Sequence, residues 1–227
     1  MAYEAQFTGA SSTDLADYTS DSSHTHTKQS GSGSLQLTGG GELYAVTSDQ
    51  GAFYTASYTP ADPHYRLSVT FIVSDLQPIV IAAGMRCETD GDGVFIQTNG
   101  FDDTFDLLQV VGGSETVLDT VAMTVGTHTL EVEIDGDDGY EWFLNSGSQG
   151  TGTISSSLSA AGLIGYSKYS ATGANNNGQR ITAVSVTEIG GGGGDETGPD
   201  CYVMTSGGLV ACTSRAMTSG GLFPPVE

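Results

Sequence analysis

Hydrophobic and polar residues alternate along much of the first part of the chain. Apolar side chains occupy every second position in three clear runs, at residues 66–74, 129–135 and 184–187. A period of two with one apolar face is typical of β-strands that are half buried and half exposed to water. The one helical candidate, around residues 12–18, is one or two turns at most. The pattern therefore predicts an all-β chain.

Turn-forming sequences separate the apolar runs. They are Asp90-Gly91-Asp92-Gly93, Asn99-Gly100, Gly112-Gly113, Asp135-Gly136 and Asn145-Ser146-Gly147. Their spacing, on the order of 8 to 14 residues, suits short antiparallel strands joined by hairpins. With roughly a dozen strands and one apolar face on each, the economical arrangement is two sheets packed face to face.

The composition changes sharply once, at an unbroken glycine run from Gly190 to Gly194. Five consecutive glycines lose too much backbone entropy to hold a strand or a helix, so this run predicts a flexible linker. The predicted organisation is a β-sandwich at 1–189, a glycine-rich acidic linker at 190–200 and a short tail at 201–227.

The tail contains an exact repeat, in which Met204-Thr-Ser-Gly-Gly-Leu209 recurs as Met217-Thr-Ser-Gly-Gly-Leu222. Each copy carries a methionine and a leucine on a small polar scaffold, too little apolar surface to offset the entropy of ordering. We therefore predict that these four residues dock onto a partner, where two weak contacts add through effective concentration. In the alternatives, the copies pair with each other or with neighbouring subunits, or the tail is a disordered end.

The charge balance excludes several partners. The 227 residues include 27 acidic and 6 basic side chains, for a formal charge of -21. Binding to nucleic acid needs a basic surface that this chain cannot build, and an anionic membrane is an equally poor partner. No apolar run approaches the ~18 residues of a membrane span, so no membrane insertion is predicted. The opening residues lack the basic and apolar regions of a secretory signal, which predicts a soluble chain not exported by one.

The runs Gly126–Gly136 and Tyr140–Asn145 resemble the paired central strands of concanavalin A-like jelly rolls, the group of laminin-G domains and family-16 glucanases. Further segments with this similarity are Phe105–Gly113, Ala161–Tyr166 and Arg180–Val186, and, for the first strand, Phe7–Gly9 and Leu15–Thr19. The resemblance covers approximately residues 3–189 and implies an antiparallel two-sheet jelly roll. Its motifs specify fold well and activity hardly at all.

Family-16 glucanases carry a Glu-x-Asp-x-Glu strand whose carboxylates act as nucleophile and general acid. The matching run here is Glu133-Ile134-Asp135-Gly136-Asp137. Its third acid is a shorter Asp, whereas catalytic groups tolerate displacements of only ~0.5 Å. Asp135-Gly136 is also a turn signal that ends the strand. Because Trp142 is the only tryptophan, a dense aromatic cleft is missing too, and the chain is predicted not to be an enzyme.

Metal sites have little support. Oxygen-rich loops suit calcium, and the loop aspartates are Asp90, Asp92, Asp102, Asp103, Asp135, Asp137 and Asp138. None matches the EF-hand spacing. His24 and His26 would share one face of a strand, but no third ligand is identifiable and their Ser and Thr neighbours indicate an exposed segment. No cofactor is predicted, and structural calcium stays open.

The aromatic residues Trp142, Tyr166 and Tyr169 are candidate glycan contacts, because sandwich lectins hold sugars with loop carboxylates or amides and an aromatic platform. The alternative is that these rings pack in the core or along an edge. Glycan binding by this surface therefore stays a hypothesis at this point, with those three residues as its candidates.

The three cysteines are too few for a disulfide scaffold. Cys87 stands alone in an apolar stretch, which predicts a buried free thiol. Cys201 and Cys212 lie in the tail and could form a disulfide in an oxidising medium. Whether they are bridged is left open.

Together these features predict a binding or structural protein, with the sandwich displayed from an assembly by the tail. Soluble β-sandwiches with short docking tails resemble bacteriophage virion decorations and fibres, which assemble in the host cytoplasm. The expected partners are other virion proteins, surface glycans and further copies of the chain in a homo-oligomer. An acidic surface would keep displayed copies apart and soluble. The alternatives are an extracellular lectin and, less favoured, a secreted glycosidase.

Overall fold

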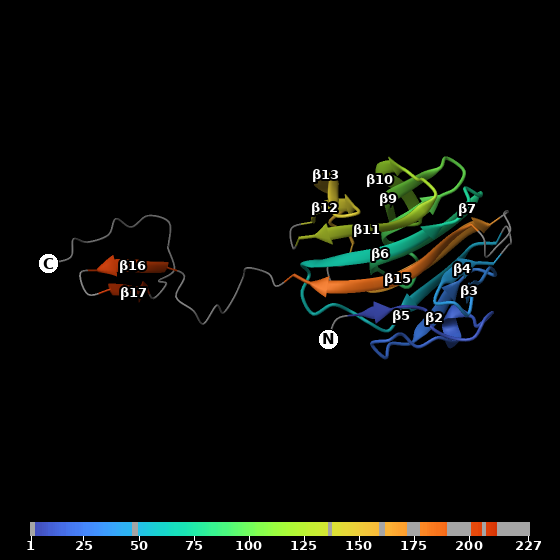
Figure 1. Cartoon of the computed structure of the whole chain (residues 1–227), viewed down its shortest axis with the longest axis horizontal. Coiled ribbons are helices and arrows are strands. Elements are labelled where there is room, and N and C mark those ends of the chain that lie inside the picture. Colours follow the sequence, from blue (N-terminus) through green and yellow to red (C-terminus); the bar gives the residue numbers. More distant parts are fainter. Residues whose placement is uncertain are drawn as a thin grey trace. The chain divides into compact units, whose positions relative to one another are not determined.

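The computed structural model describes residues 3–46, 50–135, 138–158, 162–171 and 178–189, and two tail strands at 201–205 and 208–212. It divides into two compact units, Met1–Gly191 and Gly192–Glu227. The first unit is a sandwich of two antiparallel sheets (Figure 1). This confirms the predicted all-β sandwich.

Sheet I has the strand order β13-β12-β11-β6-β15-β4-β3, with β1 paired to β15 outside this path. Its strands are β1 (Glu4–Ala5), β3 (Leu35–Leu37), β4 (Leu43–Ala45), β6 (Tyr65–Val73), β11 (Gly126–Ile134), β12 (Gly139–Leu144), β13 (Gly147–Thr153) and β15 (Gln179–Glu188). The last strand of the sandwich, β15, therefore lies in the interior of this sheet, between β6 and β4.

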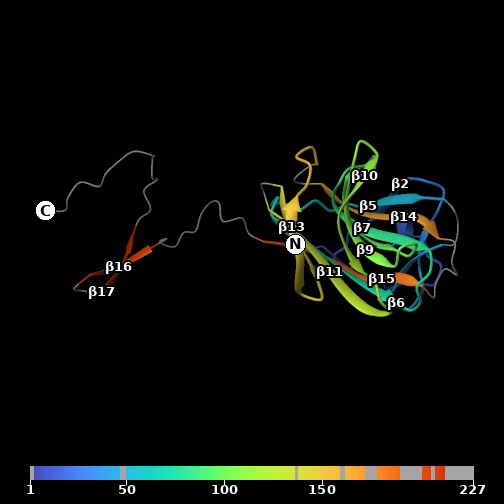
Figure 2. The same cartoon turned by 90° about the horizontal axis from the view of Figure 1, so that it is seen from above.

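Sheet II has the strand order β10-β9-β8-β7-β14-β5-β2. Its strands are β2 (His26–Ser30), β5 (Ala52–Ala56), β7 (Ile79–Cys87), β8 (Gly93–Asn99), β9 (Thr104–Val111), β10 (Ser114–Ala122) and β14 (Leu163–Ala171). Figure 2 shows β6, β11 and β15 on one side of the sandwich and β5, β7 and β14 on the other.

The core lies between the two sheets and follows the alternation of the sequence. In β6, Leu67, Val69 and Phe71 are completely buried, and the residues between them are partly exposed. Each such side chain contributes about 1.5–3 kcal/mol relative to leaving it in water. The larger fully buried rings of this core are Tyr3, Phe7, Tyr54, Tyr65, Phe71, Phe105, Trp142 and Tyr166.

The hairpin turns form where the sequence predicts them. Between β9 and β10, Gly112 and Gly113 have φ of 59° and 72°, the left-handed values of a two-residue hairpin turn. The carboxylate of Asp92 accepts hydrogen bonds from both of their amides, at 2.5 and 3.1 Å. The turn at Asn145 and Ser146 has positive φ values as well, 49° and 68°. Strand β11 ends at Ile134, which confirms the prediction that the strand stops at the Asp135-Gly136 sequence, although Gly136 itself lies outside the described residues.

The opening segment differs in part from the expectation. Its strand is only Glu4–Ala5, so the first strand expected at 7–9 and 15–19 is wrong. Phe7 has φ 51°, which interrupts an extended chain. Leu15–Asp17 form a single 3-10 turn, capped by the Asp14 carboxylate, which accepts a hydrogen bond from the amide of Ala16 at 3.0 Å. The expectation of a short helix near residues 12–18 is confirmed.

The described residues include no helix long and apolar enough to cross a membrane.

In the second unit, β16 (Cys201–Thr205) and β17 (Gly208–Cys212) form an antiparallel hairpin. The first copy of the repeat contributes to the end of β16 and the start of β17, and in the register of the hairpin Met204 pairs with Leu209 and Cys201 with Cys212. This differs from the expectation that the tail has no structure of its own, although an isolated two-stranded hairpin is marginally stable in water. Met217 and Leu222 lie outside the described residues, as does the glycine run. Docking by the tail and the disulfide stay predictions.

Candidate functional site

The outer face of sheet II contains a second group of buried apolar residues. Phe53, Ala82, Phe95 and Leu108 are between 2% and 6% exposed and contact one another, together with Cys87. They belong to the outer face because successive residues of a strand alternate, and their neighbours in the strands face the core. Buried side chains on an outer face indicate a hollow surface.

This hollow is a groove that crosses the strands of sheet II. It consists of three adjoining cavities of about 180, 270 and 380 Å³, all bordered by Tyr169. The central cavity lies over the apolar group around Phe53 and Phe95. The second, which we call the rim cavity, is lined mainly by Gln97, Asn99, Phe101, Asp102, Glu115 and Tyr169. We call the three together the sheet II groove.

Two glycines make room for the apolar floor of the groove. A Cβ atom at Gly84 in β7 would lie 2.5 Å from a ring carbon of Phe95. A Cβ atom at Gly165 in β14 would lie 2.6 Å from the sulfur of Cys87 and 2.9 Å from the Phe53 ring. Real Cβ contacts are never this short, so the rings can lie flat on the sheet only where side chains are absent. The hollow therefore depends on glycine at both positions.

A buried carboxylate fixes the polar part of the floor. Asp106 in β9 is 4% exposed and accepts four side-chain hydrogen bonds. Their donors are Gln97 (3.3 Å), Asn99 (3.1 Å), Thr104 (2.8 Å) and Thr120 (2.7 Å). Hydrogen bonds to a charged acceptor are stronger than neutral ones, so this network holds the amide side chains in place.

Gln97 connects this network to the groove. Its Nε2 donates to Asp106, whereas its Oε1 accepts no hydrogen bond from the described residues. The side chain lines both the central cavity and the rim cavity, although the residue is 91% buried. Its oxygen is thus a fixed acceptor available to a ligand.

Two aromatic rings stand exposed at the groove. Tyr169 in β14 is 74% exposed, and Phe101, in the turn between β8 and β9, is 57% exposed. Both line the rim cavity. The Tyr169 hydroxyl makes no hydrogen bond to the described residues. Exposed rings beside a concave surface are typical of binding sites.

Of the three aromatic residues predicted as glycan contacts, only Tyr169 lies at the surface. Trp142 and Tyr166 are 0% exposed, so neither ring has a face to offer a sugar. The Trp142 indole points into the sandwich and donates to Asp119 at 2.9 Å. The Tyr166 hydroxyl is 2.5 Å from that of Tyr3. Both side chains face the core from their strands, so the prediction that these two residues are surface contacts is wrong.

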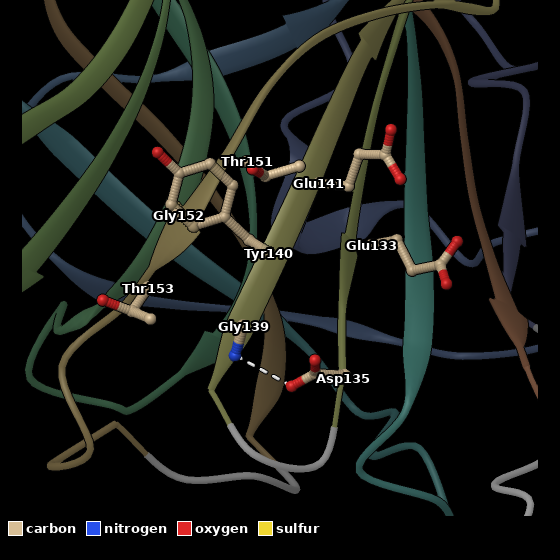
Figure 3. Close-up of a pocket in the computed structure, with 8 residues that line it drawn as sticks. All are labelled: Glu133, Asp135, Gly139, Tyr140, Glu141, Thr151, Gly152 and Thr153. Carbon is tan, nitrogen blue, oxygen red and sulfur yellow. Dashed lines mark hydrogen bonds between the residues drawn. The ribbon is translucent and has the colours of Figure 1, made fainter.

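A second hollow, of about 460 Å³, lies on the outer face of sheet I (Figure 3). It is formed by β11, β12 and β13 and contains the carboxylates of Glu133, Asp135 and Glu141. Glu133 and Glu141 are opposite one another across the β11–β12 pair and project to the same side of the ribbon. This surface carries the run that resembles the glucanase motif.

The carboxylates of this run already have partners. Glu133 accepts hydrogen bonds from Arg66 at 2.6 and 3.1 Å and from His64 at 3.0 Å. Burial raises the pKa of the Glu133 carboxyl, but these hydrogen bonds and charges outweigh it and hold the pKa below its usual value. Asp135 accepts a hydrogen bond from the Gly139 amide at 2.8 Å, which closes the turn (Figure 3). Asp137 lies outside the described residues.

The loop aspartates serve as turn and ion-pair partners. Asp102 accepts a hydrogen bond from Asn99, and Asp138 pairs at 2.7 Å with the completely buried guanidinium of Arg86. Within the described part of the chain, no three His, Cys, Asp or Glu side chains converge as a metal site would require. Cys87 is buried and unpaired as predicted, and burial raises the pKa of its thiol.

His26 lies in the core, contrary to the exposed segment expected for it. The residue is 4% exposed, with Nε2 2.8 Å from the Tyr3 hydroxyl and Nδ1 2.9 Å from the carbonyl of Tyr18. Burial lowers the pKa of this imidazole, which favours its neutral form. His24 contacts the same Tyr3 ring and the carbonyl of Ser57. The pair therefore belongs to an aromatic cluster.

No protein family matches the sequence, and no curated protein resembles it. Solved structures do match. A Bacillus licheniformis β-glucanase has a TM-score of 0.56 at 14% identity, covering 79% of this chain and 99% of its own. The carbohydrate-binding module CBM66 from Bacillus subtilis has a TM-score of 0.51 at 14% identity, covering 70% and 91%. The chain has the concanavalin A-like jelly-roll fold.

Other jelly rolls similar to this one include a β-1,3-1,4-glucanase from a mouse hindgut metagenome, with a TM-score of 0.59 at 12% identity, covering 83% of this chain and 100% of its own. The lumenal domain of VIP36 has a TM-score of 0.52 at 12% identity, covering 79% and 90%. Enzymes and binding proteins both occur among these neighbours. At such identities the likeness establishes the fold of the jelly roll and leaves its chemistry to the site.

Most of the groove is not predicted from the sequence, namely Gln97, Phe101 and Glu115, together with Asp106, which holds Gln97 in place. Two signals were present. Strand β7 is apolar at nearly every position, which indicates burial on both faces rather than one. Phe101 is a large apolar residue within an Asn-Gly turn, where exposure is expected. The first signal indicates a covered or hollow outer face, and the second indicates an aromatic residue at its edge.

Proposed function

We propose that the protein is a non-enzymatic glycan-binding protein whose ligand lies in the sheet II groove. The observation that carries the proposal is the 74% exposed ring of Tyr169, which borders all three cavities of the groove. A sugar ring has apolar faces that stack on aromatic side chains and hydroxyl groups that hydrogen-bond. The fixed oxygen of Gln97 supplies an acceptor beside that ring. The carbohydrate-binding module CBM66 among the structural neighbours supports the same function.

The proposal that the chain is not an enzyme rests on the hydrogen bonds made by Glu133 and Asp135, the carboxylates of the run that resembles the glucanase motif. A glycosidase needs two carboxylates that flank the scissile bond and are free to exchange protons. Here Glu133 is engaged by Arg66 and His64, and Asp135 closes a turn. Both lie on the outer face of sheet I, whereas the aromatic groove is on sheet II.

We further propose that the tail attaches the jelly roll to a larger assembly, such as a phage virion in which it serves as a decoration or fibre component. The exact repeat and the separation of the chain into two compact units support this role. A homo-oligomer and a location on the virion are part of this proposal. A free-standing extracellular lectin is its alternative.

Glycan binding is tested with the full chain on a panel of neutral, acidic and amine-bearing oligosaccharides, measured by calorimetry. Tyr169→Ala should weaken binding of any ligand found by roughly tenfold, since an aromatic contact contributes about 0.5–1.5 kcal/mol beyond its buried area. Val125→Ala is the matched control, because Val125 is 62% exposed and does not line the groove. Absence of binding across the panel contradicts the proposal, and release of sugars from a β-glucan contradicts its non-enzymatic part.

The attachment role is tested by removing residues 190–227. We expect the shortened chain to remain folded and to keep its glycan binding, but to be absent from the assembled particle. Met204→Ser together with Leu209→Ser in the full chain is the milder variant. Normal incorporation of both variants would contradict attachment through the tail and favour the free-standing lectin.

A further inference from the structure

The basic side chains of the described residues are all engaged by partners of their own. Arg66, Arg86 and Arg180 form ion pairs with acidic residues. Lys28 and Lys168 donate to the backbone carbonyls of Gly33 and Val46. None of the five lines the central cavity or the rim cavity. In a chain with 27 acidic residues, this part of the groove contains no cation from the described residues.

The rim cavity, of about 270 Å³, brings carboxylates and aromatic rings to one place. The carboxylate of Asp102 accepts one side-chain hydrogen bond, from Asn99. The carboxylate of Glu115 makes no hydrogen bond or ion pair to the described residues. These two carboxylates share the cavity with the exposed rings of Phe101 and Tyr169. Their charges are therefore compensated by no basic group at the site.

The oxygen of Gln97 is the further acceptor that faces this cavity. Gln97 is 91% buried and lines the cavity, and its amide nitrogen is held by Asp106, which leaves Oε1 without a donor from the described residues. Fixed in this way, the oxygen cannot turn to find a partner elsewhere. A ligand that carries hydrogen-bond donors and positive charge satisfies both it and the carboxylates.

Aromatic faces and carboxylates both attract a positively charged group. A cation over an aromatic ring gains about 0.5–1 kcal/mol at an exposed site, and more when it is shielded from water. Carboxylates within contact distance add charge-assisted hydrogen bonds. A neutral sugar gains only stacking and neutral hydrogen bonds, and an acidic sugar is repelled. The side chains of the cavity thus favour a positively charged ligand over a neutral or an acidic one.

We infer that the rim cavity binds the protonated amine of an amino sugar, so that the groove prefers glycans with free glucosamine-type units over their acetylated, neutral or acidic counterparts. This inference rests on the glycan-binding function proposed above and names its ligand class. The ammonium group lies between the carboxylates of Glu115 and Asp102. The sugar ring stacks on Tyr169 or Phe101, and the Gln97 oxygen accepts a hydrogen bond from the ligand.

The experiment compares two ligands of equal length with the full-length protein, namely glucosamine oligomers and N-acetylglucosamine oligomers. Oligogalacturonate is the acidic comparison. Calorimetry in mildly acidic, low-salt buffer keeps the amines protonated. We expect the glucosamine oligomers to bind at least tenfold more tightly than the acetylated ones, and oligogalacturonate not to bind. Added salt should reduce the difference, because it screens the charges at a partly open site.

Glu115→Gln removes one charge and retains the shape of the side chain. We expect it to reduce the preference for glucosamine oligomers at least fivefold, mainly through weaker binding of the glucosamine oligomers themselves. Glu141→Gln makes the same change of charge on the outer face of sheet I and is the matched control. An equal loss in both variants would mean that overall charge, rather than this cavity, attracts the amine, and would overturn the inference.

The remaining outcomes separate the inference from the function on which it depends. Equal affinity for glucosamine and acetylated oligomers would overturn the inference and leave glycan binding standing. Failure of every glycan in the panel to bind would overturn the proposed function itself. Persistence of the preference in alkaline buffer, where the amines are neutral, would also contradict the inference.

Discussion

The outer faces of the two sheets use carboxylates in opposite ways. On sheet I, Glu131 and Glu133 form ion pairs with Arg66, and all three side chains remain partly exposed. On sheet II, Asp106 is buried beneath a groove and held by uncharged donors, while Glu115 at the rim has no described partner. Ion pairs with Arg66 compensate part of the carboxylate charge on the first face. The other face retains unbalanced charge beside exposed rings, which makes it the better candidate for recognition.

The largest expected change in the free energy of unfolding comes from removing a buried carboxylate, compared with removing an exposed one. Asp106→Ala removes the acceptor of four side-chain donors, and we expect the free energy of unfolding to fall by about 3 kcal/mol, the upper end for buried groups deprived of partners. Glu141→Ala on sheet I should change it by no more than about 0.5 kcal/mol. Urea denaturation measures both. Similar values for the two variants would remove the contrast between the faces.

The next largest effect on stability is expected at the glycines that leave room for the apolar floor of the groove. Gly84→Ala places a methyl group 2.5 Å from the Phe95 ring, and we expect a loss of about 1–3 kcal/mol from overpacking. It should weaken glycan binding as well, because the ring must rise into the groove. Gly147→Ala on sheet I meets nothing closer than 3.4 Å and serves as the control. A stable Gly84→Ala variant with normal binding would show that the hollow does not depend on this glycine.

The smallest effect is the pH dependence of the sheet I ion pair. Because the pKa of Glu133 is lowered in the folded protein, its contribution is complete above the unfolded value of about 4.3 and is lost as the pH falls through the folded value. For a partly exposed pair we expect about 0.5 kcal/mol. The stability difference between wild type and Glu133→Gln should therefore shrink in acid. A difference that grows on acidification would contradict this assignment.

The sequence predicts sheet I far better than sheet II, for a physical reason. One face of β6 and β11 is exposed to water, so their alternation shows directly which residues face the core. Strands β7 and β8 are buried on both faces and show no such phase. The groove also depends on Gly84 in β7 and Gly165 in β14, which are about eighty positions apart in the sequence but pair with each other in the sheet. That register is a property of the assembled sheet.

The candidate site was predicted only in part. Tyr169 was predicted as an aromatic platform for a sugar, but the same argument included Trp142 and Tyr166, which face inward. In β12, the polar residue Glu141 between Tyr140 and Trp142 already indicates an inward phase for the tryptophan. The polar network of Asp106 joins residues from three strands, and no local spacing reveals it.

The place of β15 affects how the chain reaches its native state. Since this last strand of the sandwich lies between β6 and β4, sheet I stays divided until residues 179–188 are available. The hydroxyl of Tyr3 likewise gains its hydrogen bond to Tyr166 only when that residue, 163 positions later, is available. Contacts so distant in sequence slow folding. During synthesis the domain should therefore remain incomplete until nearly its entire length has left the ribosome, and then close in one late, cooperative step.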